Sequence, residues 1–139
     1  MALRDILASI EPESIPYPFS RLYAALSGTG LFRDFYRIVA RQVFEKRRAG
    51  RVLDIGTGPG RLPVVIANES PLLQVTGLDL SADMVKIATQ EAQRRGLKNL
   101  TFRQGSASEL PFPDAEFDLV ISTLSFHHWK QPEKALDEI

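Results

Sequence analysis

The sequence contains no cysteine, and this absence removes several classes of chemistry at once. Disulfide bonds, zinc sites with cysteine ligands, iron–sulfur clusters and thiolate nucleophiles all require that side chain. Neither sign of charge is in excess, because 17 Lys and Arg side chains are balanced by 17 Asp and Glu side chains. This balance gives no electrostatic reason to expect a nucleic acid or an anionic membrane as a partner.

Long apolar runs are also missing. No run approaches the roughly 20 residues that a membrane-spanning helix needs. Residues 1–13 mix charged and apolar side chains, which argues against a secretory signal peptide. We therefore expect a cytoplasmic protein without a membrane span. The chain is long enough for one folded domain with a core, because 44% of its 139 residues are hydrophobic.

Strand-like and helix-like segments alternate from residue 51 onward. Strands are expected at residues 51–55, 73–79, 100–104 and 117–123, and helices at residues 61–68, 82–95 and 133–139. This alternation is typical of βαβ units around a parallel sheet. The last strand is expected to be buried on both faces, because its residues 119–121 are consecutive and apolar.

Residues 1–50 differ from the rest of the chain, because prolines interrupt their first part. Apolar residues then recur at helical spacing, which predicts a helix that carries Phe32, Phe35, Tyr36, Val39 and Val43 on one side. Basic residues 46–48 suit the end of that helix, as a solvated terminus or as a phosphate site, and Gly50 is expected to close it. We predict an N-terminal helical extension over residues 1–50 and a main domain over residues 51–139.

Three glycines, Gly56, Gly58 and Gly60, follow the first predicted strand within five residues. Glycine lets the backbone turn sharply and lets a ligand come close, and the next helix offers unpaired N–H groups. A dinucleotide-binding loop requires its third glycine at position 61, where Arg61 stands. The carboxylate of Asp54 would repel a pyrophosphate and suits a cationic ligand with ammonium and sulfonium groups. A nicotinamide dinucleotide is therefore the weaker candidate.

A second acid, Asp79, closes the next predicted strand about 20 residues after the glycines. An acid at this spacing is placed to accept hydrogen bonds from both hydroxyls of a ribose. The alternative is that Asp79 caps the following helix. Ser81 can serve as that cap, with Asp83 in the first turn, so we predict ribose binding for Asp79.

Four blocks of the sequence together resemble the class I S-adenosylmethionine-dependent methyltransferases. Residues 54–60 are similar to motif I of that family, and Asp79 is similar to the ribose-binding acid of motif II. Residues 104–114 resemble the adenine-contacting loop, and residues 117–123 resemble the fourth strand. The blocks occur in the family's order, and they are most similar to the small-molecule group that includes ubiquinone and menaquinone biosynthesis enzymes.

The resemblance implies an α/β fold with a Rossmann-like parallel sheet in the strand order 3-2-1-4 and with flanking helices. It implies that the C-terminal strands of the family fold are missing, which leaves the fourth strand as an open edge. It further implies S-adenosylmethionine as the cofactor, bound by Asp54, Gly56, Thr57, Gly58, Gly60, Asp79, Leu80, Met84, Ser106, Ala107 and Thr123.

One position departs from the family pattern, because Ser106 stands where Asp or Asn is usual. Recognition of adenine is therefore expected to depend on the backbone of Ala107 and on packing by Leu80 and Met84. Met84 is equally well read as an ordinary core residue.

The substrate side offers two candidate catalytic residues, His127 and His128, just beyond the fourth predicted strand. Either histidine is able to take a proton near neutral pH, and a structural role is the alternative. No metal is expected, because adjacent histidines point apart and no third ligand is suitably spaced. Aromatic residues of the N-terminal zone are candidates for a substrate lid or for ordinary packing: Tyr17, Phe19, Tyr23, Phe32, Phe35 and Tyr36.

These features predict methyl transfer to a small molecule by in-line displacement. Such a reaction depends on alignment and exclusion of water more than on a strong acid or base. After the fourth predicted strand the chain lacks the Asn/Asp-Pro-Pro-aromatic pattern of enzymes that methylate amide or adenine nitrogens. The alternatives are a cofactor-binding module without turnover, and a subunit completed by homodimerisation across the open fourth strand.

Overall fold

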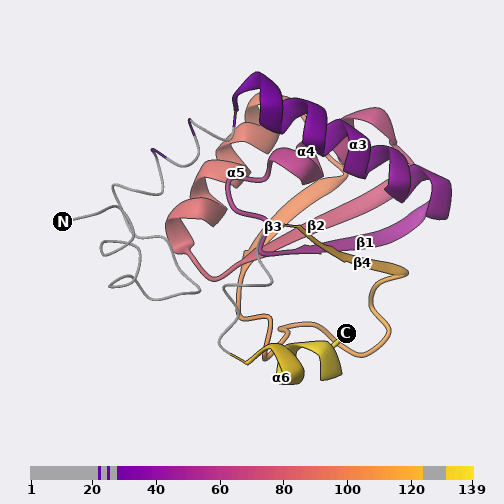
Figure 1. The fold of residues 1–139 in the computed structure, drawn as a ribbon, viewed down its shortest axis with the longest axis vertical. Coiled ribbons are helices and arrows are strands. Elements are labelled where there is room, and N and C mark those ends of the chain that lie inside the picture. The colour runs from indigo at the N-terminus through magenta and orange to yellow at the C-terminus, as the bar shows by residue number, and fades with distance from the viewer. Residues whose placement is uncertain (1–21, 23–24, 26–27, 124–130) are drawn as a thin grey trace.

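The computed structural model describes residues 22, 25, 28–123 and 131–139 of the chain. Its centre is a parallel sheet of β1 (Gly50–Ile55), β2 (Leu73–Asp79), β3 (Leu100–Gln104) and β4 (Leu119–Ser122). The strand order is β3-β2-β1-β4, which confirms the predicted order 3-2-1-4 (Figure 1). The helices are α3 (Gly30–Lys46), α4 (Arg61–Glu69), α5 (Ala82–Arg94) and α6 (Pro132–Asp137).

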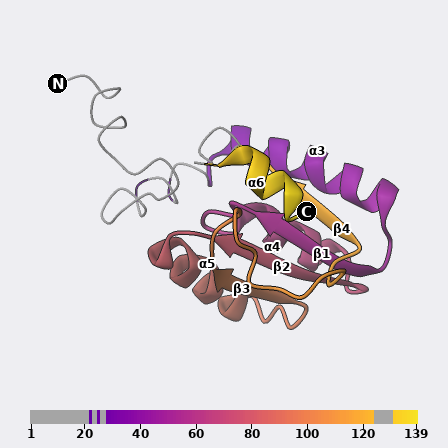
Figure 2. The ribbon, with the colours of Figure 1, turned by 90° about the horizontal axis from the view of Figure 1, so that it is seen from below.

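The helices form two unequal layers around this sheet. Figure 1 shows α3, α4 and α5 on one side of the sheet and α6 on the other. The view from below shows α6 and the loop that leads from β3 to β4 in front of the strands (Figure 2). Two contacts join that loop to the α6 region, because the Leu110 N–H donates to Glu138 Oε2 at 3.0 Å and Ser108 Oγ donates to the Gln131 carbonyl at 3.5 Å.

Each face of the sheet has its own apolar cluster, because successive side chains of a strand point to opposite faces. On the helical face, buried Val52 and Val75 pack with residues of α3, α4 and α5. On the other face, Leu53, Ile55 and Leu78 pack against the loop between β3 and β4. The sheet is therefore covered on both sides at its two central strands.

Helix α3 contributes Tyr36, Ala40 and Val43 to the cluster on the helical face, with Phe32 and Phe35 packed against it. The rings of Phe32 and Phe35 lie 6.2 and 5.6 Å from the ring of Tyr36. These three aromatic side chains therefore pack in or against the hydrophobic core. The other lid candidates, Tyr17, Phe19 and Tyr23, lie outside the described residues, so the lid and the boundary at residue 50 stay predictions.

Gly50 does not close the preceding helix, and this expectation was wrong. Helix α3 ends at Lys46, and the extended Arg47 is its C-cap. Gly50 instead begins β1 with a φ of +115°, and a Cβ there would lie 2.5 Å from Asp118 Oδ2. That carboxylate accepts the Arg51 N–H at 2.8 Å. The glycine is needed because this hydrogen bond brings Asp118 against the backbone.

The fourth strand is shorter and more exposed than expected. It covers Leu119–Ser122, and its three apolar residues are half-buried instead of buried on both faces. The reason is its position, because among the described strands β4 pairs with β1 alone.

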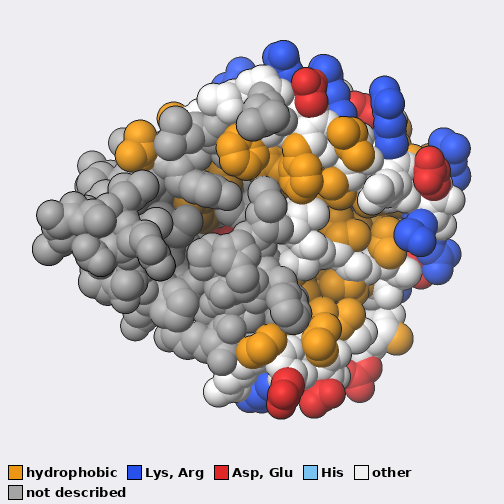
Figure 3. Space-filling model, viewed as in Figure 1, with side chains coloured by type: hydrophobic (Ala, Val, Ile, Leu, Met, Phe, Trp, Pro, Cys, Tyr) orange, Lys and Arg blue, Asp and Glu red, His pale blue; other side chains and the backbone are white. Residues whose placement is uncertain are grey.

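The surface carries both signs of charge. Basic side chains gather near α3, and acidic side chains lie at the opposite end of the same face, near α6 (Figure 3). In the part of the chain that the structure describes, no helix combines the length and the apolar character that crossing a membrane requires.

We predict that Gly50→Ala lowers the free energy of unfolding by about 2–3 kcal/mol, from strain at positive φ together with the displaced Asp118 carboxylate. Gly96→Ala is the matched control, because Gly96 also has positive φ, at +66°, but no atom of the described residues lies within 4 Å of an added Cβ. The control should lose only about 1 kcal/mol. Urea unfolding measures both variants, and equal losses would contradict the role of Asp118.

Candidate functional site

The candidate site lies where β1 ends and α4 begins. Three glycines in this turn adopt positive φ angles, 72° at Gly56, 57° at Gly58 and 78° at Gly60. Side chains with a Cβ rarely adopt this conformation, so the backbone itself requires glycine here. The structure thus contains the strand, glycine turn and helix that the spacing predicted.

The turn is fastened to the end of β2 by its own N–H groups. Gly56 and Thr57 donate to the carbonyl of Leu78, at 2.8 and 3.0 Å. Gly58 donates to Asp79 Oδ2 at 2.8 Å, and Gly60 donates to the carbonyl of Thr57 at 3.1 Å. The conformation of the turn therefore depends directly on β2.

Asp79 joins two elements through one carboxylate. Its second oxygen, Oδ1, accepts the Ser81 N–H at 2.9 Å. Burial raises the pKa of Asp79, and the hydrogen bonds from Ser81 and Gly58 oppose that rise. Ser81 Oγ accepts the Met84 N–H at 3.3 Å, which confirms Ser81 as the cap of α5. Ser81, and not Asp79, is therefore the N-cap of α5. The binding of ribose by Asp79 stays a prediction.

Asp54 is a buried acid, with 2% of its surface exposed. Within the described residues, its Oδ1 atom has no hydrogen-bond partner. The pKa of Asp54 is raised to about 7, because burial and, to a smaller extent, the charge of Asp79 raise it by more than the Thr57 side chain lowers it. A buried carboxylate oxygen without a hydrogen-bond partner is costly, so this position favours a positively charged group nearby.

The remaining predicted residues lie around the carboxyl ends of the strands. The Gly105 N–H donates to the carbonyl of Asp79 at 3.0 Å, which brings the loop of Ser106 and Ala107 close to β2. Ser106 Oγ accepts the Ser108 N–H at 3.2 Å. Thr123 is half-buried and follows Ser122, whose Oγ donates to the carbonyl of Ile55 at 3.1 Å.

Two more predicted residues differ in burial. Met84 is only 1% exposed, as is usual for a core residue. Leu80 is half-buried, and its carbonyl accepts a hydrogen bond from Gln104 Nε2 at 3.0 Å. Contact of either residue with adenine stays a prediction. His127 and His128 lie outside the described residues.

Sequence reasoning missed Gly77 and Phe102. A Cβ added at Gly77 would lie 2.5 Å from the ring of Phe102 and 2.8 Å from Thr57 Oγ1. A glycine inside an apolar strand often marks such a close approach, and that signal was available in the sequence.

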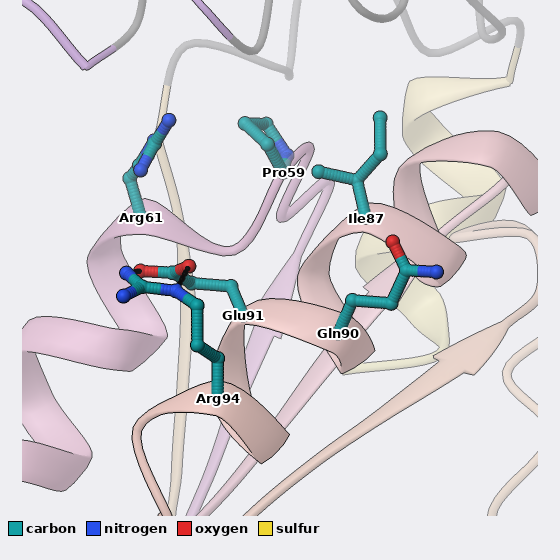
Figure 4. Close-up of a pocket in the computed structure, with 6 residues that line it drawn as sticks. All are labelled: Pro59, Arg61, Ile87, Gln90, Glu91 and Arg94. Carbon is teal, nitrogen blue, oxygen red and sulfur yellow. Dashed lines mark hydrogen bonds and ion pairs between the residues drawn. The ribbon is translucent and has the colours of Figure 1, made fainter.

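A pocket of about 280 Å³ lies on the outer side of the turn, between the start of α4 and α5 (Figure 4). Figure 4 shows the side chains of Glu91 and Arg94 next to each other, and Arg94 Nε donates to Glu91 Oε2 at 2.9 Å. The hydrogen bond from Arg94, together with Arg95, lowers the pKa of Glu91 to about 2 against the opposing effect of burial. None of the predicted cofactor-binding residues lines this pocket, which is lined by Pro59, Arg61, Ile87, Gln90, Glu91 and Arg94.

We predict that Asp54→Asn changes how stability depends on pH. The pKa of Asp54 in the folded protein, about 7, lies above its ordinary value of 3.8, so the folded state holds the proton more tightly. The wild-type free energy of unfolding should therefore fall between about pH 4 and pH 7 and level off above.

The variant should lack this part of the fall. It should be more stable than the wild type at pH 8 by on the order of a few kcal/mol, since one pKa unit corresponds to about 1.4 kcal/mol. Below pH 4 the two proteins should converge. Urea titrations from pH 4 to 8 measure the difference, and a difference that is constant with pH would contradict the prediction.

The chain is similar to known methyltransferases. Residues 53–139 match the family model described as a methyltransferase domain. An uncharacterized methyltransferase of Bacillus subtilis, YcgJ, is 40% identical over 96 residues, which are 68% of this chain and 37% of that protein. A demethylmenaquinone methyltransferase of Deinococcus radiodurans is 30% identical over 138 residues, which are 99% of this chain and 54% of that protein.

Solved structures agree with this. A crystal structure from Methanococcus maripaludis, provisionally assigned as an S-adenosylmethionine-dependent methyltransferase, has a TM-score of 0.80 and 30% identity. The match covers 86% of this chain and 55% of that one. The chain thus spans about half or less of the length of these relatives. The family model and these likenesses show that the chain belongs to the S-adenosylmethionine-dependent methyltransferase family.

Proposed function

We propose that this chain binds S-adenosylmethionine at the carboxyl ends of β1 and β2 and that the whole protein methylates a small molecule. The observation that carries this proposal is the glycine turn next to two acids with raised pKa values, Asp54 and Asp79. Parallel α/β sheets bind ligands outside the carboxyl ends of their strands, where this turn lies.

The charge of the site supports this cofactor over a dinucleotide. S-adenosylmethionine carries a sulfonium and an ammonium group, whereas a nicotinamide dinucleotide carries a pyrophosphate. Among the described residues, Oδ1 of Asp54 has no hydrogen-bond partner, and it is an acceptor that a positive group satisfies and a phosphate does not. The residues present therefore fit the cofactor of the family.

Asp79 keeps acceptor capacity for a ribose. Each carboxylate oxygen has about two lone-pair sites, and each oxygen of Asp79 accepts one backbone N–H, from Gly58 or from Ser81. One further hydrogen bond per oxygen is available, which matches the two hydroxyls of a ribose. The two backbone bonds hold the carboxylate in place beforehand, so little freedom is lost on binding.

The reaction that fits this site is an in-line displacement. When bound, S-adenosylmethionine supplies a methyl group on a positively charged sulfur. The chain's own part is to bind and orient through the glycine turn, Asp79 and the loop that contains Ser106. Alignment of this kind contributes roughly 7–11 kcal/mol in good intramolecular cases, so a strong acid or base is not required.

The acceptor that we propose is a small molecule. The chain has no net charge, which gives no general attraction for a nucleic acid or another highly charged acceptor. The relative from Deinococcus radiodurans is named for demethylmenaquinone, which is a small-molecule acceptor. The cytoplasmic location that the sequence predicts remains part of this proposal.

We predict that the chain binds S-adenosylhomocysteine and does not bind NAD, as measured by isothermal titration calorimetry. Asp79→Ala should weaken binding at least tenfold, because charged hydrogen bonds are typically worth about 1.5–3 kcal/mol. Asp83→Ala is the matched control, since it removes an acid from the first turn of α5 without touching the glycine turn, and it should bind like the wild type. Binding of NAD, or equal affinity of Asp79→Ala, would refute the proposed site.

We also propose that the edge of β4 that no described strand covers pairs with a second copy of the chain. The half-buried Leu119, Val120 and Ile121 lie along this edge, where the backbone offers hydrogen-bonding groups to a further strand. Ile121→Lys should convert a dimer to a monomer in sedimentation equilibrium. Thr101→Lys on β3, at the other edge, is the control. A wild-type chain that sediments as a monomer would end this proposal.

A further inference from the structure

The ring of Phe102 occupies the space that a side chain at Gly77 would fill. The two residues are register partners on β3 and β2. A Cβ at Gly77 would lie 2.5 and 2.6 Å from two ring carbons of Phe102 and 2.8 Å from Thr57 Oγ1. Gly77 does not have a positive φ, so lack of space is the reason for glycine at this position.

The same ring reaches the other end of the glycine turn. A Cβ at Gly60 would lie 2.6 Å from Phe102 Cζ and 2.9 Å from the Cβ of Ala88 on α5. The N–H of Gly60 donates to the carbonyl of Thr57 at 3.1 Å. The ring therefore lies next to Gly60, and it approaches the same point beside Gly77 as the Thr57 hydroxyl does.

We propose that Phe102 is a positioning residue that sets the conformation of the glycine turn from the sheet side. The ring fills the space between Gly77 on β2 and Gly60 in the turn, and so supports the segment in which Gly58 donates to Asp79. It acts through the turn and does not itself contact the cofactor. The proposal deepens the proposed function, on which its link to cofactor binding rests.

Leu100 shows how a residue that only fills the core would behave. It lies on the same strand and face, two residues nearer the start of β3, and it is 6% exposed. Its register partner is Val75, which packs in the core below the turn. Leu100→Ala is therefore a matched control that costs stability without removing support from the turn.

The first experiment follows amide hydrogen exchange in the full chain without any cofactor. The N–H groups of Gly56, Thr57, Gly58 and Gly60 are hydrogen-bonded and should exchange slowly. Phe102→Ala should raise exchange over residues 56–60 at least tenfold after correction for the global stability of each variant. Leu100→Ala should leave the corrected exchange unchanged.

The second experiment measures the affinity for S-adenosylhomocysteine by calorimetry. Phe102→Ala should bind at least tenfold more weakly than the wild type, and Phe102→Leu should lie between them. Leu100→Ala should bind within twofold of the wild type. Should Phe102→Ala fail to fold, Phe102→Leu decides by the same two readouts.

A double-variant cycle tests the contact itself. Gly77→Ala should raise exchange over residues 56–60 in the wild-type background, because its Cβ displaces the ring and the Thr57 hydroxyl. The same change should have a smaller effect in the Phe102→Ala background, where the ring is gone. Equal effects in the two backgrounds would overturn the proposal.

The proposal also fails if Phe102→Ala matches Leu100→Ala in both corrected exchange and affinity. A wild-type chain that binds no S-adenosylhomocysteine refutes the proposed function instead. The exchange measurements then still decide whether Phe102 positions the turn.

Discussion

The contact between the glycine turn and the end of β2 is the interaction on which the rest of the site depends. Gly56 and Thr57 donate to the carbonyl of Leu78, and Gly58 donates to the carboxylate of Asp79. These bonds require the turn to approach β2 closely, and positive φ at three glycines makes that approach possible. Because the turn leads into α4 and Asp79 leads into α5, the same bonds set the position of two helix starts.

The second constraint is the burial of acid next to this turn. Asp54 is nearly inaccessible and its pKa is raised to about 7, so its ionised form costs stability in the protein without a ligand. Natural proteins keep such unfavourable groups mainly where function needs them. A ligand with positive charge would offset this cost. The methyl donor of the family, S-adenosylmethionine, carries such a charge, so the electrostatics of the site suit it.

Two expectations failed where distant parts of the chain meet. Gly50 has the sequence context of a helix end, yet it begins β1 because Asp118 lies against its backbone. The apolar residues 119–121 read as a fully buried strand, yet β4 pairs with one neighbour among the described strands and stays half-buried.

The sequence by itself determined the succession of strands and helices along the chain, the glycine turn and the cap at Ser81. These features depend on the local spacing of apolar residues and on backbone preferences, both of which are set by residues close together in the sequence. Only the tertiary structure decided that Phe102 and Thr57 share the space beside Gly77, although Phe102 lies 25 positions further along the chain than Gly77. It also decided the burial of Asp54 and hence its raised pKa. Contacts between distant segments and the loss of water around a charge arise only from packing, so no local pattern reports them.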